Sequence, residues 1–182
     1  FDLMDLAKRP VLLQLMVDHL PAVIAEKGEG EPIDASDLYR HCIASELERK
    51  RNVLPLIIPN KARMELLERL AVWMFLNDTL VFHIKVLEEE LNLGRFLEVQ
   101  SSWEVEKYLN EFLTFSFLIR DGYNRFRMSH KSFRDYLTAV VFVREINSGQ
   151  IEHFGKNKTT DEINHFISEQ QPGKEKLLHL ID

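Results

Sequence analysis

The spacing of apolar residues predicts helices over most of the chain. Residues 2–26 carry apolar side chains at nearly helical intervals, and Pro10 interrupts this stretch. A proline lacks the backbone N–H donor and pushes its predecessor out of the helical region. We therefore expect a short helix up to about Lys8 and a second helix with Pro10 in its first turn. The clearest periodicity runs from Lys61 to about Phe75, where apolar residues recur every three and four positions.

Further elements follow from shorter patterns. A helix is expected to begin near Asp34, and another after Ser101 or Ser102, because serine and aspartate are favoured at the N-cap. Between these helices, residues 81–84 favour a short strand and residues 86–91 favour a helix.

Two β-prone runs lie in the second half of the chain. Phe115–Arg120 and Arg125–Met128 are joined by a turn, Asp121–Asn124, that contains a glycine. This arrangement predicts a β-hairpin. Ser129 is then expected to cap a strong helix that ends near Gly149. Helices followed by a single hairpin are typical of a winged helix, in which the hairpin is the wing.

Together these elements predict a mainly α protein. We expect a small helical domain over residues 1–55 and a winged helix with one β-hairpin over residues 56–149. Residues 150–182 are expected to form short C-terminal helices or a linker. Pro55 and Pro59 mark the boundary between the first two domains. The chain opens and closes inside helical patterns, so we expect both ends to be cut from a longer protein.

Composition and charge narrow the class of protein. The 182 residues are 45% hydrophobic and 29% charged, as in ordinary globular proteins. The net charge of −6 opposes general binding to nucleic acid. A single cysteine, Cys42, excludes an intramolecular disulfide and fits a reducing, cytoplasmic compartment. The most apolar stretch, Leu70–Ile84, is too short and too polar to span a bilayer, so no membrane partner is expected.

Recognisable catalytic and metal-binding motifs are missing from the sequence. It contains no Gly-rich phosphate loop and no nucleophile elbow. Adjacent helical residues point about 100° apart, so His41 and Cys42 make a poor reactive pair, and Cys42 is interpreted as a buried thiol. His153, His165 and His179 are too far apart for zinc and are interpreted as surface histidines. We therefore expect neither enzyme activity nor a bound metal or cofactor in this chain by itself.

One candidate binding feature is the pair Ser129 and His130. With Ser129 as the cap, His130 takes the first helical position, where unpaired N–H groups and the positive end of the helix dipole favour an anion such as phosphate. The same dipole disfavours a charged imidazole, so His130 would act as a neutral donor. The pattern leaves a second interpretation open, in which His130 caps its own helix or packs against the hairpin.

A second candidate feature is a basic cluster in and after the hairpin. It consists of Arg120, Arg125, Arg127, Lys131 and Arg134. Two acidic residues lie among these five basic ones, which leaves a local surplus of three positive charges. The cluster suits a nucleic-acid backbone, an acidic partner domain of the same protein, or ordinary cross-strand and solvent-facing charge.

At this point the sequence resembles a known family. The segment Phe126–Ala139, FRMSHKSFRDYLTA, resembles the winged-helix signature of NACHT-type signal-transduction ATPases, which belong to the STAND class. That signature has an aromatic residue, a histidine, Ser-Phe, an acidic or amide residue, a second aromatic residue and a small apolar pair. Upstream, Leu6–Leu13 resembles the first helical-domain motif of the family, a proline followed by leucines, and Leu66–Ala71 is similar to the opening helix of its winged-helix domain. The resemblance covers roughly residues 3–147, and the family's P-loop, Mg²⁺-binding acid and first sensor would lie before Phe1.

What the resemblance implies is a nucleotide switch in a full-length parent. In the resting, ADP-bound state the winged-helix histidine contacts the β-phosphate and holds the winged helix on the nucleotide-binding domain. Exchange to ATP releases this contact and allows homo-oligomerisation in signalling or defence. By position, His130 matches that histidine and Pro10 matches a proline that contacts the base. ADP or ATP with Mg²⁺ would be the parent's cofactors, its nucleotide-binding domain would be the intramolecular partner, and this chain would be a non-catalytic regulatory fragment.

An alternative class is a DNA-binding winged helix attached to an initiator-type AAA+ ATPase. The basic hairpin favours it. The acidic total charge and the His-Lys-Ser-Phe sequence at residues 130–133 favour the nucleotide switch.

Overall fold

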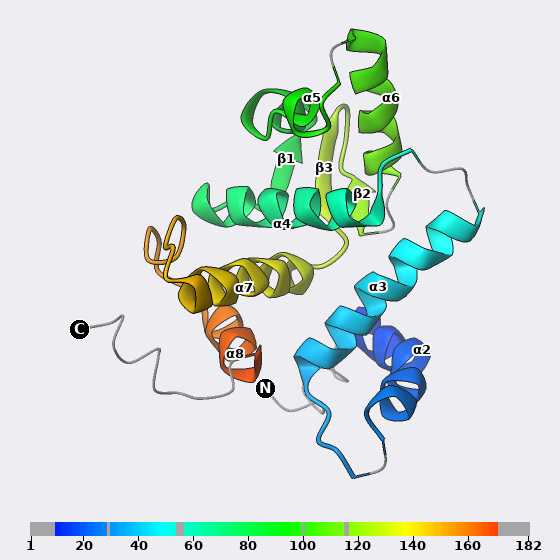
Figure 1. The fold of residues 1–182 in the computed structure, drawn as a ribbon, viewed down its shortest axis with the longest axis vertical. Coiled ribbons are helices and arrows are strands. Elements are labelled where there is room, and N and C mark those ends of the chain that lie inside the picture. Colours follow the sequence, from blue (N-terminus) through cyan, green and yellow to red (C-terminus); the bar gives the residue numbers. More distant parts are fainter. Residues whose placement is uncertain (1–9, 29, 54–56, 100, 115–116, 171–182) are drawn as a thin grey trace. The chain divides into compact units, whose positions relative to one another are not determined.

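The computed structural model describes residues 10–28, 30–53, 57–99, 101–114 and 117–170 (Figure 1). The chain divides into two compact units. We call Phe1–Leu47 with Ala139–Asp182 the helical unit, and Glu48–Thr138 the sheet unit. The helices α3 (Ala35–Val53) and α7 (Lys131–Ser148) contribute residues to both. The domain boundaries expected at residues 55 and 149 divide the chain differently and remain a prediction.

The helical unit also contains α2 (Pro10–Lys27) and α8 (Asp161–Gln170). Its buried apolar side chains include Val23, Leu38, Phe142, Ile163 and Ile167. The rings of Tyr39 and Phe166 meet edge to face with centroids 5.2 Å apart, a geometry that aromatic pairs prefer. This ring contact joins α3 to α8 in the core of the unit.

Two aspartates fix the beginning of α3. Asp34 Oδ1 accepts a hydrogen bond from the Asp37 N–H at 2.9 Å, and Asp37 Oδ2 accepts one from the Asp34 N–H at 3.1 Å. This reciprocal capping satisfies amides that have no partner inside the helix. Just before it, α2 gives way to Gly28, whose φ of +95° is a left-handed conformation that glycine adopts readily after a helix.

Between α3 and α7, the described part of the sheet unit forms helices and three short strands. In chain order they are α4 (Asn60–Leu76), β1 (Val81–His83), the π-helix η1 (Val86–Glu90), α5 (Leu93–Phe96), α6 (Ser102–Leu113), β2 (Leu118–Arg120) and β3 (Arg125–Met128). The strands form an antiparallel sheet in the order β1-β3-β2 (Figure 1). A helix, a short strand, further helices and a hairpin are the elements of a winged helix. The prediction of a mainly α fold with one hairpin is confirmed.

The two faces of this sheet differ in chemistry, because successive side chains of a strand point to opposite sides. Phe82 lies opposite Phe126, and their rings stack with centroids 5.9 Å apart on the buried face. On the other face Val81, Arg127 and Ile119 lie in register, and Ile119 is exposed.

The turn between β2 and β3 has the predicted position. Asp121 N–H donates to Arg125 O at 2.8 Å and closes the hairpin. Gly122 and Asn124 have φ of +110° and +54°, which glycine and asparagine tolerate best. The turn chemistry of the sequence therefore specifies the tip of the hairpin.

Glu111 on α6 holds the chain that leads into α4. Its carboxylate accepts hydrogen bonds from the backbone N–H groups of Ile57 and Ile58 at 2.8 and 2.9 Å. It also accepts one from the Arg63 guanidinium at 2.6 Å, and the Arg63 side chain is fully buried. A buried charge requires such a partner, so α4 and α6 are joined by an ion pair as well as by apolar packing.

The expected helices agree with the structure in type and in approximate bounds. The helix predicted from Pro10 is α2, the long periodic stretch is α4, and the strong helix after the hairpin is α7. The short helix expected up to Lys8 and the last one expected beyond residue 170 lie outside the described residues. None of the described helices is both long and apolar enough to cross a membrane.

Candidate functional site

His130 lies in the connection between β3 and α7, directly before the first residue of the helix. Its half-buried ring folds back on that helix, where Nδ1 accepts a hydrogen bond from the Ser132 N–H at 3.2 Å and contacts the Ser132 hydroxyl. This is the geometry of an N-cap residue, which accepts from the second helical amide. Because an accepting Nδ1 carries no proton, we assign the proton of the neutral ring to Nε2, which is then the donor of the ring.

This arrangement corrects the prediction for Ser129. The sequence predicts Ser129 as the cap and His130 as the first helical residue, but α7 begins at Lys131 and the imidazole provides the cap. The Ser129 N–H donates to Phe117 O at 2.7 Å instead and extends the pairing of the hairpin. Ser129 therefore belongs to the sheet, which moves the helix start one residue further along the chain.

A buried ion cluster holds the first turns of α7. The Arg134 guanidinium donates to Asp135 Oδ1 at 2.9 and 2.7 Å, and the Lys131 ammonium lies 3.3 Å from Asp135 Oδ2. Arg134 also donates to the backbone carbonyl of Thr79 at 3.4 Å, in the turn between α4 and β1. Polar contacts thus attach the beginning of α7 to the rest of the sheet unit.

Apolar packing also fixes the beginning of this helix. Phe133 is buried, and its ring lies 4.7 Å, centroid to centroid, from the ring of Phe117. Leu137 is also buried, one turn further on. The turn that carries His130 therefore sits on a rigid support.

The five basic residues of the expected cluster do not form one surface. Arg134 is buried in the ion cluster, so the expectation that it faces a partner is corrected. Arg120 and Arg125 are exposed on the hairpin, where Arg120 donates to Gly122 O and Arg125 lies 3.7 Å from Asp121. Arg127 is half-buried and donates to backbone carbonyls at the end of β3, while Lys131 is partly engaged by Asp135.

Pro10 is the first residue of α2, as expected, but its side chain lies outside the described part of the structure. Its contact with a base therefore stays a prediction.

Cys42 lies on α3 and is buried, as expected from the sequence. Burial raises the pKa of the Cys42 thiol to about 12, with Glu46 and Asp18 adding to the effect, so its interpretation as a buried thiol is confirmed.

His153 and His165, interpreted as surface histidines, are partly exposed, and each has a carboxylate partner. His153 Nδ1 lies 2.6 Å from Glu145, His165 Nε2 lies 2.6 Å from Glu169, and both rings are about three-quarters buried, with exposures of 27% and 24%. The spacing of His165 and Glu169, four residues on one helix, is a signal that sequence analysis overlooked. His179 lies outside the described residues.

Comparison with known proteins yields one distant relative. The chain is 23% identical over 146 residues to an uncharacterised WD repeat-containing protein of the cyanobacterium Nostoc sp.. The match covers 80% of this chain but only 9% of the relative, so the chain spans a small part of that protein's length. No family model and no solved structure matches the chain.

Proposed function

We propose that this chain is the regulatory, non-catalytic part of a NACHT-type STAND ATPase, and that His130 distinguishes bound ADP from bound ATP. One observation carries the proposal. His130 stands at the positive end of an 18-residue helix with Nδ1 used for capping, and with Nδ1 accepting we assign the ring proton to Nε2. A neutral imidazole with this orientation suits a phosphate oxygen.

The surroundings of His130 support a role in recognition. The ion cluster around Asp135 and the packing of Phe133 fix the turn that carries the ring, and a preorganised donor loses little entropy on binding. A charge-assisted hydrogen bond to phosphate contributes roughly 1.5–3 kcal/mol. That energy shifts an equilibrium between closed and open forms by about one to two powers of ten.

The distant relative is compatible with a multidomain parent. It carries WD repeats by name and is more than ten times as long as the matched segment, because that segment is 9% of its length. A segment like this one therefore occurs within a large protein. In the proposed parent, the nucleotide-binding domain would precede the chain and would supply the phosphate loop.

Three substitutions of His130 test the proposal in the full-length parent. His130→Ala removes both ring nitrogens. His130→Asn keeps an acceptor near the position of Nδ1, and asparagine is among the best N-cap residues. His130→Gln instead places an amide near the position of Nε2. The measurements are the rate of ADP release from the parent and the thermal stability of the 182-residue chain.

Capping and nucleotide contact predict different results for these variants. As a cap, His130 contributes about 0.5–2 kcal/mol of stability, which Ala loses and Asn restores. As a phosphate donor, it slows ADP release, so Ala and Asn should both accelerate release by about ten- to a hundredfold. His130→Gln should retain part of the slow release. Wild-type ADP release in both the Ala and Asn variants would leave His130 with its capping role alone.

Binding of DNA through the wing is the competing function. Tyr123 at the tip of the hairpin is 85% exposed, and Arg120 and Arg125 flank it on the surface. In helix-turn-helix proteins, however, the second helix of the pair enters the major groove. Here that helix would be α6, where Glu111 is neutralised by Arg63 and Glu104, Glu106 and Lys107 leave a net charge of −1. Such a helix offers no surplus of positive charge to the phosphates, so the nucleotide switch is preferred.

A further inference from the structure

A cavity in the sheet unit is lined by charged and apolar side chains together. Its volume of about 360 Å³ lies within the range of small-ligand sites, about 300–1,000 Å³. The lining residues come from α4, from the end of η1 and from the segment that continues into α5, and they are Arg69, Glu90, Leu91, Asn92, Arg95 and Phe96. A few polar groups set on an apolar wall are what a site needs to orient a small ligand.

Arg69 is held in place before any ligand binds. Its guanidinium donates a hydrogen bond to Glu65 Oε1 at 2.8 Å, and its Cζ lies 4.6 Å from the centroid of the Phe96 ring. A cation over the face of an aromatic ring is attracted by the negative charge of that face. Because Glu65 already matches the charge of Arg69, the pair of Arg69 and Phe96 forms a wall of the cavity with little charge of its own to offer.

Two uncommon backbone conformations shape the chain beside this wall. In the π-helix η1, the Leu91 N–H donates to Val86 O at 2.9 Å, five residues back. Asn92 follows with a φ of +48°, a left-handed conformation that asparagine tolerates better than most residues. Short π-helices are rare and are frequently found at functional sites. These two conformations fix the course of the backbone that carries the charged residues on either side of Asn92.

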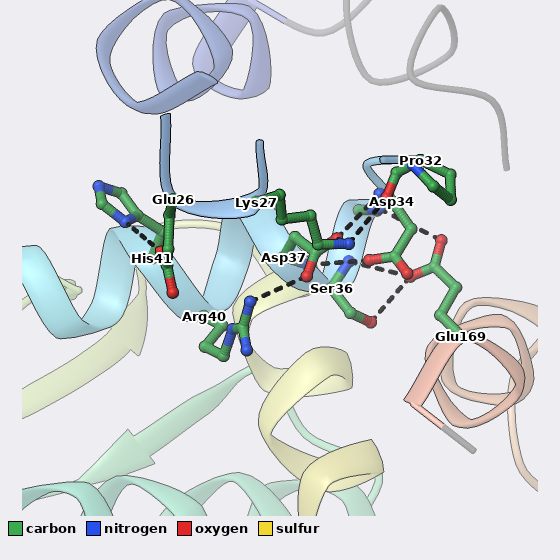
Figure 2. Close-up of polar contacts among 10 residues, drawn as sticks. Glu26, Lys27, Pro32, Asp34, Ser36, Asp37, Arg40, His41 and Glu169 are labelled. Carbon is green, nitrogen blue, oxygen red and sulfur yellow. Dashed lines mark hydrogen bonds and ion pairs between the residues drawn. The ribbon is translucent and has the colours of Figure 1, made fainter. Parts of the chain in front are cut away.

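Glu90 and Arg95 bring two opposite charges to the cavity, and no described residue satisfies them. Both side chains are exposed, and neither they nor the Asn92 amide group make a hydrogen bond or an ion pair with any described residue. Other carboxylates of the chain are engaged: Glu169 on α8, for example, accepts hydrogen bonds from the Ser36 N–H and hydroxyl at 2.9 and 2.8 Å (Figure 2). The cavity therefore offers one free carboxylate and one free guanidinium to a ligand.

We propose that this cavity binds a free α-amino acid with an apolar side chain. Its carboxylate would bind Arg95, since a guanidinium can hold a carboxylate through two parallel hydrogen bonds, and its ammonium group would bind Glu90. Its side chain would lie against Leu91 and Phe96, which are half-buried. This inference does not depend on the proposed function.

The balance of charge favours a zwitterion over a simple ion. A simple anion would be attracted by Arg95 but repelled by Glu90 and by a chain of net charge −6. A simple cation would be attracted by Glu90 but repelled by Arg95. An α-amino acid carries both charges on one carbon atom, so each meets its opposite within a cavity of this size.

Amide chemical shifts of the full 182-residue chain, followed by NMR during titration, test the proposal. The probes are L-leucine, isocaproate, which is leucine without its amino group, and isoamylamine, which is leucine without its carboxylate. The variants Arg95→Gln and Glu90→Gln each remove one charge from the cavity. The control is Glu88→Gln, an exposed glutamate of the same π-helix that does not line the cavity.

We expect L-leucine to shift the amides of residues 90–96 saturably, with a Kd of about 1 mM as befits so small a ligand. Arg95→Gln and Glu90→Gln should each weaken this binding about tenfold, and Glu88→Gln should bind as the wild type does. The two leucine fragments assign the contacts, because each lacks one charge. Isocaproate should lose affinity in Arg95→Gln alone, and isoamylamine in Glu90→Gln alone.

Three results would overturn the proposal. One is the lack of saturable shifts at residues 90–96 with L-leucine up to about 20 mM, well above a millimolar Kd. Another is binding that Arg95→Gln and Glu90→Gln leave at the level of the control, which would make both residues ordinary solvent-facing charges. The third is isocaproate binding as tight as that of L-leucine, because the ammonium contact with Glu90 would then be missing.

Discussion

Three glutamates use the same bonding pattern at different places in the chain. Glu111, Glu145 and Glu169 each accept hydrogen bonds from two consecutive backbone N–H groups outside their own helix. Each also binds a basic side chain, namely Arg63, His153 or His165. A carboxylate can accept several hydrogen bonds, so one residue satisfies amides of a loop or a helix start that no regular structure pairs. In this chain, acidic residues on helices organise the segments around those helices.

The contribution of such a carboxylate to stability can be tested at Glu145 by varying the pH. Burial alone would raise its pKa, but hydrogen bonds from the Phe154 N–H and from His153 lower it below the ordinary value of 4.5. A lowered pKa in the folded state means that the ionised form stabilises the fold. That contribution is complete above about pH 4.5 and is lost as the pH falls through the lower folded-state value. Glu145→Gln should therefore destabilise the chain by about 1–3 kcal/mol at neutral pH, and the difference should shrink in acid.

The measurement is the free energy of unfolding in urea at several pH values. Glu152→Gln is the matched control, since Glu152 contacts the same histidine at 3.6 Å but is 78% exposed. It should change stability by less than about 0.5 kcal/mol. A Glu145→Gln effect that stays constant between pH 7 and acid would mean that the charge of Glu145 does not matter.

These carboxylate contacts are the part of the structure that sequence analysis did not predict. Periodicity identifies which side of a helix is apolar, and a glutamate outside that stripe is assigned to solvent by default. Glu111 and Glu169 instead bind amides 53 to 134 residues away, and no local pattern reports such a partner. The partners of His153 and His165 were not predicted either, although Glu169 lies only four residues after His165 on the same helix.

At the scale of the elements, local patterns were sufficient for most helices and for the hairpin. The apolar spacing of α4 and the Gly122-containing turn are local signals, and both elements lie where they were predicted. The start of α7 was predicted one residue too early. The backbone N–H of Ser129 donates a hydrogen bond to Phe117 O, so Ser129 extends the pairing of the hairpin and does not cap the helix. A serine before a helix predicts a cap only when no neighbouring strand uses its backbone.

The ion pair between Arg63 on α4 and Glu111 on α6 leads to a prediction about how these two helices are held together. Glu111→Ala would leave the fully buried Arg63 guanidinium without its carboxylate and would remove the acceptor of two backbone amides. Breaking a buried pair from one side costs about 3–5 kcal/mol, so the sheet unit should lose most of its stability. Glu111→Gln keeps one acceptor oxygen and should cost less, about 1–3 kcal/mol.

Urea unfolding followed by tryptophan fluorescence measures both variants, since Trp73 lies on α4 and Trp103 on α6. Glu106→Ala is the control on the same helix, because its side chain is exposed and should matter by less than about 0.5 kcal/mol. If Glu111→Ala cost no more than this control, the ion pair would not hold the two helices together.

At the scale of the whole molecule, charge separates the two candidate functions. The chain carries a net charge of −6, so its long-range field opposes a polyanion. The exposed positive charge is confined to the hairpin, because Arg134 is buried and does not add to it. The mainly α fold with one hairpin is compatible with either function, so fold alone does not decide between DNA and a nucleotide-dependent partner.

Duplex DNA should therefore bind poorly. Backbone contacts dominate non-specific affinity, and each neutralised phosphate adds to the salt dependence. Arg120, Arg125 and Arg127 offer three cations, while Glu104, Glu106 and Lys107, the charged residues of α6 outside the Arg63 ion pair, carry a net charge of −1 toward the groove into which that helix would have to enter. We expect fluorescence anisotropy with a labelled duplex of about 20 base pairs to give no sub-micromolar binding at about 0.15 M salt. Tight, salt-sensitive binding that is lost in Arg125→Ala and Arg127→Ala would contradict this and would support the initiator-type alternative. Binding that survives both substitutions would mean that DNA binds to another surface and that the hairpin is not the DNA-binding element.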